Sequence, residues 1–238
     1  MASAPSGPQS ASSSSGDVAA AKAETTLLAA LRRAFFFEPR LLAASAPATS
    51  LADVSRLLNP TSIMVGLSGG LDSSLLLALL CDLRASGELT LSLRAIHINH
   101  GLQEAANKWQ LHCETLCAEL GVKLSVCVVD CSLNSAGVTT ERVFAESAAV
   151  SEEAARRARY AAFEGALDAG EWLALGHHQD DQMETLLYRI FRGTGIGGLR
   201  AIRRKTKFGK GFLYRPMLNV SRDKIEEYAH LKNLKWIC

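Results

Sequence analysis

The sequence predicts an α/β protein with an open parallel sheet and helices on both of its faces, a three-layer α/β/α arrangement. Short and nearly uninterrupted apolar segments alternate with longer amphipathic segments between residues 62 and 193. This alternation is typical of a parallel sheet whose strands are buried on both sides. The length of 238 residues suits one large domain, and 48% hydrophobic and 21% charged residues are ordinary for a globular protein.

Each element follows from its local pattern. The β-branched and apolar runs predict strands over residues 62–67, 91–98, 123–130 and 171–176. Helical periodicity and stop signals predict helices over residues 73–87, 103–121, 151–170 and 180–193. A Gly-x-Gly turn within residues 200–217 predicts a β-hairpin. Ser221 is predicted to cap a last helix over residues 222–234.

Composition divides the chain into four parts. Residues 1–23 are rich in Ser, Ala, Gly and Pro and are expected to be disordered. Residues 24–61 are expected to form a helical extension that packs through Phe35, Phe36 and Phe37. Residues 62–220 are predicted to be the main α/β domain, and residues 221–238 the start of a linker or C-terminal region. The first segment has few acids, which leaves a transit peptide open, but it also lacks arginine, which argues against one.

Hydropathy argues against a membrane as a partner of this protein, and the distribution of charge bears on whether it binds a polyanion. No apolar run reaches the roughly 18 to 20 residues that span a bilayer, so we expect no membrane partner. Residues 200–238 carry 11 Lys and Arg against 3 Asp and Glu. This basic segment indicates a polyanion such as RNA, or alternatively an ordinary solvated face.

The six cysteines are expected to be reduced, because no secretory signal precedes them. The pairs Cys113/Cys117 and Cys127/Cys131 have C-x3-C spacing, whereas zinc ribbons use C-x2-C. We therefore predict that the cysteines are small buried hydrophobic residues rather than metal ligands.

The stretch after the first predicted strand has the chemistry of a phosphate-binding loop. Ser68, Gly69 and Gly70 would turn backbone N–H groups toward an anion at the carboxyl edge of the sheet. The helix that opens near Ser73 would add its positive dipole end. A carboxylate in such a loop is repulsive unless a cation bridges it, so Asp72 predicts Mg²⁺ on the bound phosphates.

A second polar cluster follows the fourth strand. His177 and His178 emerge at the same sheet edge as the phosphate loop. Asp181 and Glu184 are three residues apart, so both carboxylates should share one helix face and hold a substrate ammonium or steer a proton. Zinc bound by His177, His178 and Asp181 is the less favoured alternative.

Arg156 and Arg159 are also three residues apart on a predicted helix. One face of that helix would present two guanidinium groups, which suits a phosphate or nucleotide. Spacing alone favours a solvated face paired with Glu152 and Glu153, and the neighbouring motifs reverse that preference.

Together these motifs resemble the tRNA(Ile)-lysidine synthetase family, within the PP-loop ATP pyrophosphatases. The motifs are S-G-G-L-D-S, H-I-N-H-G-L, E-x-x-A-R-x-x-R-Y, H-H-Q-D-D-Q-x-E-T, R-G-T-G-I-x-G-L, R-P-x-L-x-V-S-R and L-x-W-I, in that order over residues 63–237. The resemblance implies an adenine nucleotide hydrolase-like fold, with residues 62–220 as the PP-loop ATP-binding catalytic domain. It also implies an enzyme that uses ATP and Mg²⁺ to adenylate the wobble cytidine of tRNA(Ile) with a CAU anticodon. L-lysine then displaces AMP to form lysidine.

The resemblance also implies residue roles. The residues expected to hold ATP are Ser68, Gly69, Gly70, Leu71, Asp72, Ser73, Ile96, His97 and His177. The strand end over residues 96–98 is expected to flank the adenine. The residues expected to be catalytic are Asp72, Arg156, Asp181 and Glu184. Arg156 is expected to stabilise the charge that develops on the α-phosphate or on the cytosine oxygen, and Asp181 and Glu184 are expected to bind the lysine amine. His177 and His178 are expected to shape the pocket and touch phosphate rather than to act as the base.

Family members continue after the tryptophan as W-I-E-D-P-S-N toward a tRNA-binding region, whereas only Cys238 follows Ile237 here. We therefore expect ATP binding to persist and tRNA modification to be weak. The alternatives are a tRNA thiolation enzyme of the same superfamily, disfavoured because the chain has no C-x-x-C pair, and a non-catalytic ATP- or RNA-binding remnant. Family precedent favours a homodimer. The expected compartment is the bacterial cytoplasm, with a plastid as the alternative.

Overall fold

The computed structural model describes residues 27–30, 32–33, 60–99, 104–129, 152–193 and 201–237. The predictions for residues 1–23, for the three consecutive phenylalanines and for Cys131 and Cys238 lie outside the described residues.

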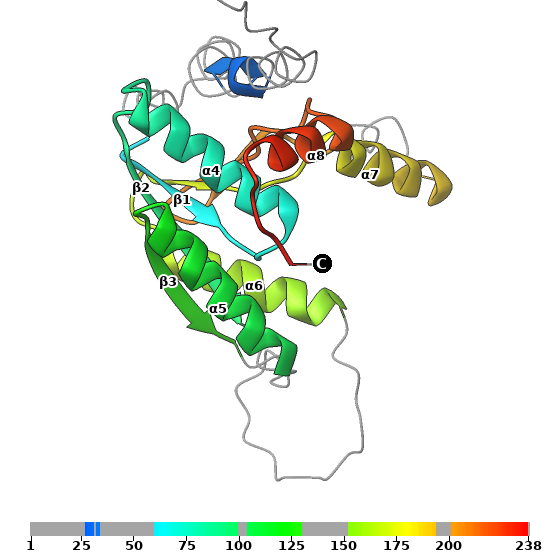
Figure 1. Cartoon of the computed structure of the whole chain (residues 1–238). Coiled ribbons are helices and arrows are strands. Elements are labelled where there is room, and N and C mark those ends of the chain that lie inside the picture. Colours follow the sequence, from blue (N-terminus) through cyan, green and yellow to red (C-terminus); the bar gives the residue numbers. More distant parts are fainter. Residues whose placement is uncertain are drawn as a thin grey trace, which may run out of the picture.

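The described strands form one sheet in the order β3-β2-β1-β4-β6-β5 (Figure 1). The strands are β1 (Ser62–Gly66), β2 (Ser92–Asn99), β3 (Lys123–Val128), β4 (Trp172–Ala174), β5 (Lys205–Phe208) and β6 (Gly211–Tyr214). All neighbouring pairs are parallel except β5 with β6. The predicted hairpin is thus confirmed, and its second strand also pairs with β4, which extends the sheet beyond the predicted strands.

Helices cover both faces of this sheet, as predicted. The helices that follow residue 60 are α4 (Leu71–Ala85), α5 (Glu104–Glu119), α6 (Glu152–Ala166), α7 (Gln179–Phe191) and α8 (Arg222–Leu231). One core cluster joins α4, α5 and α8 to the sheet, and a second joins α6 to its other face. Because α8 contributes Ile225, Tyr228 and Ala229 to the first cluster, it packs as part of the same body as the sheet.

The start of α4 and the cap of α8 differ from the expectation. Helix α4 begins at Leu71, two residues early, because Gly70 has the extended backbone of an N-cap residue, with φ −75° and ψ 167°. Asp72 therefore lies in the first helical turn. Ser221 does occupy the N-cap position of α8, but its side chain makes no capping hydrogen bond, so that part of the prediction is wrong.

The cysteines of the described residues behave as predicted on the helices. Cys81, Cys113 and Cys117 are buried between α4 and α5, and burial raises the pKa of the Cys113 thiol to about 12 and that of Cys117 to about 11. Cys127 on β3 is only half-buried. Among the described helices, none is both long and apolar enough to cross a membrane.

A buried ion pair holds the amino-terminal edge of the sheet together. Glu171, which precedes β4, is 0% exposed. It accepts hydrogen bonds from Nε and Nη2 of Arg94 on β2, from the Ser62 hydroxyl and from the Asp168 backbone N–H. Burial acts to raise the pKa of the Glu171 carboxyl, but these donors outweigh burial and hold its pKa below the ordinary value.

Replacing Arg94 with methionine should therefore destabilise the fold by about 3–5 kcal/mol, because it leaves a carboxylate buried without its cation. Urea unfolding of the variant measures this loss. Arg32→Met is the matched control, since Arg32 pairs with Glu88 at the surface and its loss should change stability far less. Equal losses in the two variants would contradict this account of the buried pair.

Candidate active site

The loop between β1 and α4 is shaped by glycine backbone and serine hydroxyls. Gly69 has φ +88°, and a Cβ there would meet Cys113 Sγ at 3.2 Å, so the position favours glycine. The Ser68 N–H donates to Ser73 Oγ at 3.1 Å, and the Gly70 N–H donates to Ser68 Oγ at 3.3 Å. These bonds wrap the loop around the N-terminus of α4, where an anion is stabilised by the helix dipole.

Asp72 is held by the arginine that ends the R-P-x-L-x-V-S-R motif, a residue to which the sequence assigned no role. Arg222, the first residue of α8, donates from Nη1 to both Asp72 oxygens at 2.9 and 3.0 Å. Burial raises the pKa of the Asp72 carboxyl, and the Arg222 guanidinium and His178 oppose that shift. The two residues are 150 positions apart, so only the fold brings them together.

The end of the described chain also reaches this loop. Past α8 the backbone turns back, and the Ile237 N–H donates to the Gly69 carbonyl at 3.0 Å (Figure 1, red). His230 and Trp236 form an edge-on ring contact on the way, with centroids 5.5 Å apart. The segment that the sequence assigned to a further region therefore supports the phosphate loop.

A cavity of about 310 Å³ opens beside the loop. Of the residues predicted to bind ATP, those whose atoms line it are Ser68, Asp72, Ser73, His97 and His177. Ile96 and Leu71 instead have their side chains in the core, and neither Gly69 nor Gly70 lines this cavity. Ile98 lines the cavity in place of Ile96, because residues two apart share a strand face and Ile98 is nearer the carboxyl edge.

One side of this cavity is apolar. Its large hydrophobic lining residues are Leu67, Ile98, Trp109, Tyr160, Phe163 and Leu175. His97 is buried, and its Nδ1–H donates to the Leu67 carbonyl at 2.9 Å; burial lowers the pKa of this imidazole. The cavity thus has a polar end that suits a phosphate group and an apolar side that suits a flat aromatic base.

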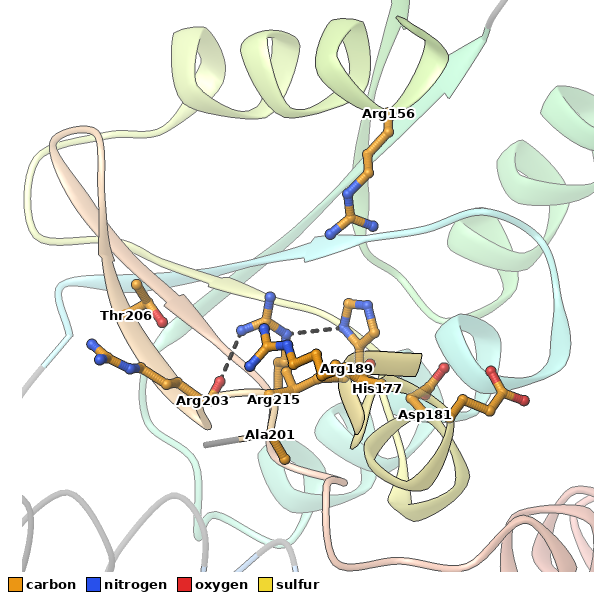
Figure 2. A pocket seen from close by; sticks show the side chains of 11 residues that line it. Arg156, His177, Asp181, Arg189, Ala201, Arg203, Thr206 and Arg215 are labelled. Carbon is orange, nitrogen blue, oxygen red and sulfur yellow. Dashed lines mark hydrogen bonds between the residues drawn. The ribbon is translucent and has the colours of Figure 1, made fainter. Parts of the chain in front are cut away.

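A second cavity, of about 940 Å³, adjoins the first and is strongly charged. Figure 2 shows the side chains that line it. Its charged residues are Arg156, Asp181, Glu184, Arg189, Arg203 and Arg215. Three residues, Arg156, His177 and Asp181, line both cavities, so they mark the place where the two meet. The predicted pair of carboxylates on α7 does share one cavity.

The two adjacent histidines are held at the start of α7 in different ways. His178 is the N-cap, and its Nδ1 accepts from the Asp180 N–H at 3.3 Å. Asp181 Oδ2 accepts from the His178 N–H at 2.7 Å, which completes a reciprocal cap. His178 Nε2 lies 3.8 Å from Asp72 and 3.6 Å from Asp181. His178 therefore links the phosphate loop to the acidic helix.

The predicted arginine pair on α6 is divided between the cavities. Arg156 reaches both, and its guanidinium carbon lies 5.0 Å from the Tyr160 ring centroid. Arg159 lines only the smaller cavity. Figure 2 shows the Arg156 side chain extending from its helix toward the group formed by His177 and Arg215.

A family model described as a PP-loop domain matches residues 42–238. The chain belongs to the PP-loop domain family. Two curated relatives are tRNA(Ile)-lysidine synthases. That of Pseudomonas syringae pv. tomato is 42% identical over 191 residues, which are 80% of this chain and 40% of the relative. That of Pseudomonas putida is 44% identical over 180 residues, 76% of this chain and 39% of the relative. The PP-loop chain thus spans about two fifths of the length of these relatives.

Among solved structures, the U34-tRNA thiolase NcsA from Methanococcus maripaludis, determined with its iron–sulfur cluster, matches this PP-loop domain with a TM-score of 0.62. The match covers 91% of this chain and 66% of that chain at 17% identity. At that identity the likeness shows the shared fold alone.

The PP-loop domain also depends on a close backbone contact at Gly176. A Cβ at this position would lie 2.9 Å from the Asp72 carbonyl group and 3.1 Å from the Ser73 N. Gly176→Ala should therefore push the start of α4 away from the strand exit and weaken ATP binding by about tenfold or more, the scale of an overpacked contact. Isothermal titration with ATP and Mg²⁺ measures the change.

Gly165→Ala is the control for this variant, because nothing lies within 4 Å of a Cβ at Gly165 on α6. It should bind ATP like the parent chain. If Gly176→Ala bound ATP with unchanged affinity, the phosphate loop would not depend on this contact.

Proposed function

We propose that this PP-loop domain is a carbon–nitrogen ligase that attaches L-lysine to the wobble cytidine of tRNA(Ile) with a CAU anticodon, forming lysidine. The observation that carries the proposal is the meeting of a nucleotide-sized cavity and a larger charged cavity at Arg156, His177 and Asp181. The curated relatives, which are tRNA(Ile)-lysidine synthases, support the same activity. Two adjoining cavities suit a reaction in which an activated group passes from ATP to a second substrate.

ATP is assigned to the smaller cavity. Ser68, Gly69, Gly70 and Ser73 would hold its phosphates at the α4 N-terminus, and the apolar side near Ile98 would flank adenine. Asp72 would hold Mg²⁺, since this ion commonly takes one or two protein carboxylates together with phosphate oxygens. Asp72 lines that cavity, which supports the fit. When bound, Mg²⁺ supplies neutralisation of the phosphate charge.

The larger cavity is assigned to the cytosine and to lysine. In the first step the cytosine O2 attacks the α-phosphorus of ATP and diphosphate leaves. In the second step the neutral lysine amine attacks C2, the C–O bond breaks and AMP leaves, while the nitrogen loses a proton. Arg156 would stabilise charge on the α-phosphate oxygens. Asp181 and Glu184 would bind the lysine ammonium and orient it before it is deprotonated.

Incubation with ATP labelled at the α-phosphate, L-lysine and a tRNA(Ile) transcript tests the proposal, with the protein in excess over RNA so that weak turnover is seen. Labelled AMP should accumulate only when both lysine and RNA are present, and the RNA should gain the mass of lysine less water. Binding of ATP without turnover would indicate a non-catalytic remnant. Turnover that needs sulfide in place of lysine would indicate thiolation. The organisms of the relatives support a bacterial cytoplasm, and a plastid is the alternative compartment.

Helix α7 supports self-association of the protein. Within the described part of the chain, none of the residues of α7 is buried. An apolar strip on its surface is exposed and consists of Met183, Leu187, Ile190 and Phe191, of which Phe191 is 84% exposed. An exposed strip of this kind commonly marks an interface, and we propose that a second copy covers it. Light scattering should show a dimer that Phe191→Glu converts to a monomer, whereas Trp109→Glu, which alters an exposed side chain on α5, should not. A monomeric parent chain would refute the dimer.

A further inference from the structure

Arg215 contacts His177 at the place where the two cavities meet. Arg215 directly follows β6 and is 8% exposed. Its Nε lies 3.1 Å from His177 Nδ1, and its Nη1 donates to the Arg203 carbonyl at 2.8 Å. Figure 2 shows both bonds as dashed lines. The arginine is therefore fixed at two points and cannot turn away from the histidine without losing a buried hydrogen bond.

The chemistry of this contact defines the proton positions on the imidazole. A guanidinium group has five N–H donors and no acceptor. The hydrogen in the contact must then belong to Arg215, and His177 Nδ1 must accept it with its lone pair. A neutral imidazole with an unprotonated Nδ1 carries its proton on Nε2. The contact thus leaves His177 with a single donor, Nε2–H.

We infer that Arg215 is a positioning residue that holds His177 as a neutral imidazole, so that Nε2–H donates to an acceptor oxygen at the junction of the two cavities. The identity of that oxygen, on the α-phosphate of the adenylated cytidine, rests on the proposed function. On this inference His177 does not remove the proton from lysine. A donor aimed at developing negative charge is worth about 10²–10³ in kcat.

The charged surroundings agree with a neutral His177. Burial is the largest cause of its lowered pKa, and Arg215, Arg156 and Arg159 lower it further against the opposing charge of Asp181, to about 4. The remaining charged side chains around the larger cavity are Glu184, Arg189 and Arg203. His177 should consequently stay neutral at every pH above about 5, and its protonation should play no part in turnover near neutral pH.

Nitrogen NMR of the whole chain labelled in histidine tests the tautomer without any substrate. His177→Gln identifies the resonances of His177 among the six histidines. Between about pH 5.5 and about pH 8, Nδ1 should show the shift of an unprotonated nitrogen and Nε2 that of a protonated one. A protonated Nδ1, or a full titration near pH 6.5, would overturn the inference. This readout stands even if no lysidine forms, so failure of the proposed function is a separate result.

A matched pair of substitutions tests the donor in catalysis. The side-chain amide nitrogen of His177→Gln can reach the place of Nε2, whereas that of His177→Asn reaches only the place of Nδ1. We expect His177→Gln to keep kcat within about tenfold of the parent and His177→Asn to lose about 10²–10³. Equal losses, or a parent profile in which activity falls with an inflection near pH 6.5, would instead mean that His177 acts as a base.

Arg215→Met and Arg215→Lys test the positioning role. The methionine variant removes the donor and a cation, so the acid limb of the kcat profile should move up in pH, toward the ordinary histidine value. The lysine variant retains a cationic donor, so the acid limb of its kcat profile should lie between those of the parent and of the methionine variant. Unchanged acid limbs in both folded variants would overturn the role of Arg215. If Arg215→Met does not fold, the lysine variant and the NMR measurement decide the question.

Discussion

Asp72→Ala should abolish turnover, lowering kcat by about 10³-fold or more, because a carboxylate that holds a phosphate-bound Mg²⁺ contributes several kcal/mol to catalysis. Asp72 lines the smaller cavity in the first turn of α4. Its nearest cation is Arg222, at 2.9 Å, so the variant also leaves that guanidinium without its partner. Single-turnover formation of labelled AMP gives the rate, and the Mg²⁺ dependence of ATP binding shows whether the metal site has been lost.

Two control variants distinguish a role of Asp72 in holding Mg²⁺ from a role in anchoring α8. Asp82→Asn alters a carboxylate on the same helix that pairs with Tyr228 and Lys232, and it should leave the rate unchanged. Arg222→Met removes the partner while keeping the carboxylate, and it should cost much less than Asp72→Ala. If Arg222→Met were as inactive as Asp72→Ala, Asp72 would serve mainly to anchor α8.

Asp181→Asn should raise the Michaelis constant for lysine about 10- to 100-fold while kcat changes less. A hydrogen bond to a charged group is worth about 1.5–3 kcal/mol, and the neutral amide loses most of that difference. The helix cap should survive, because the asparagine oxygen can still accept from the His178 N–H that Asp181 now binds at 2.7 Å. Initial rates over a range of lysine concentrations measure the change, and affinity for ATP should stay within about twofold.

Asp180→Asn is the matched control, since Asp180 lies beside Asp181 in the same helical turn but lines neither cavity. It should leave the use of lysine unchanged. A normal Michaelis constant in Asp181→Asn would remove Asp181 from the lysine site and leave Glu184 as the remaining acid for that role.

The sequence was sufficient for features that depend on local patterns. Apolar strands and periodic helices predicted the order of elements after residue 60, and Gly69 and Asp72 marked the phosphate loop. The parallel sheet then brings the ends of β1 and β4 to one edge, as the expected crossover topology requires. This is why His177 and Asp181 lie beside the loop over residues 68–73, although more than a hundred positions of sequence separate them from it.

The contacts that complete the site could not be predicted locally. Arg215 and Arg222 stood at the two ends of the R-P-x-L-x-V-S-R motif, in a basic segment that suited RNA or an ordinary solvated face. In the structure Arg215 binds His177 and Arg222 binds Asp72. Their roles depend on β6 pairing with β4 and on α8 packing against α4. Of residues 96–98, which the sequence places beside the adenine, His97 and Ile98 line the cavity and Ile96 packs in the core, because the strand pattern alone does not show how far along the strand the cavity lies. Charge composition records how many arginines are present, and only the tertiary structure determines which side chain each one contacts.

The most direct test of the account is a crystal structure of the chain with Mg²⁺ and an ATP analogue that cannot be cleaved between the α and β phosphates. We predict that the phosphates will contact residues 68–73, that adenine will lie against Ile98, and that the α-phosphate will face His177 and Arg156. A triphosphate bound instead among Arg189 and Arg203, away from the glycines, would contradict the assignment of the two cavities and the chemistry built on it.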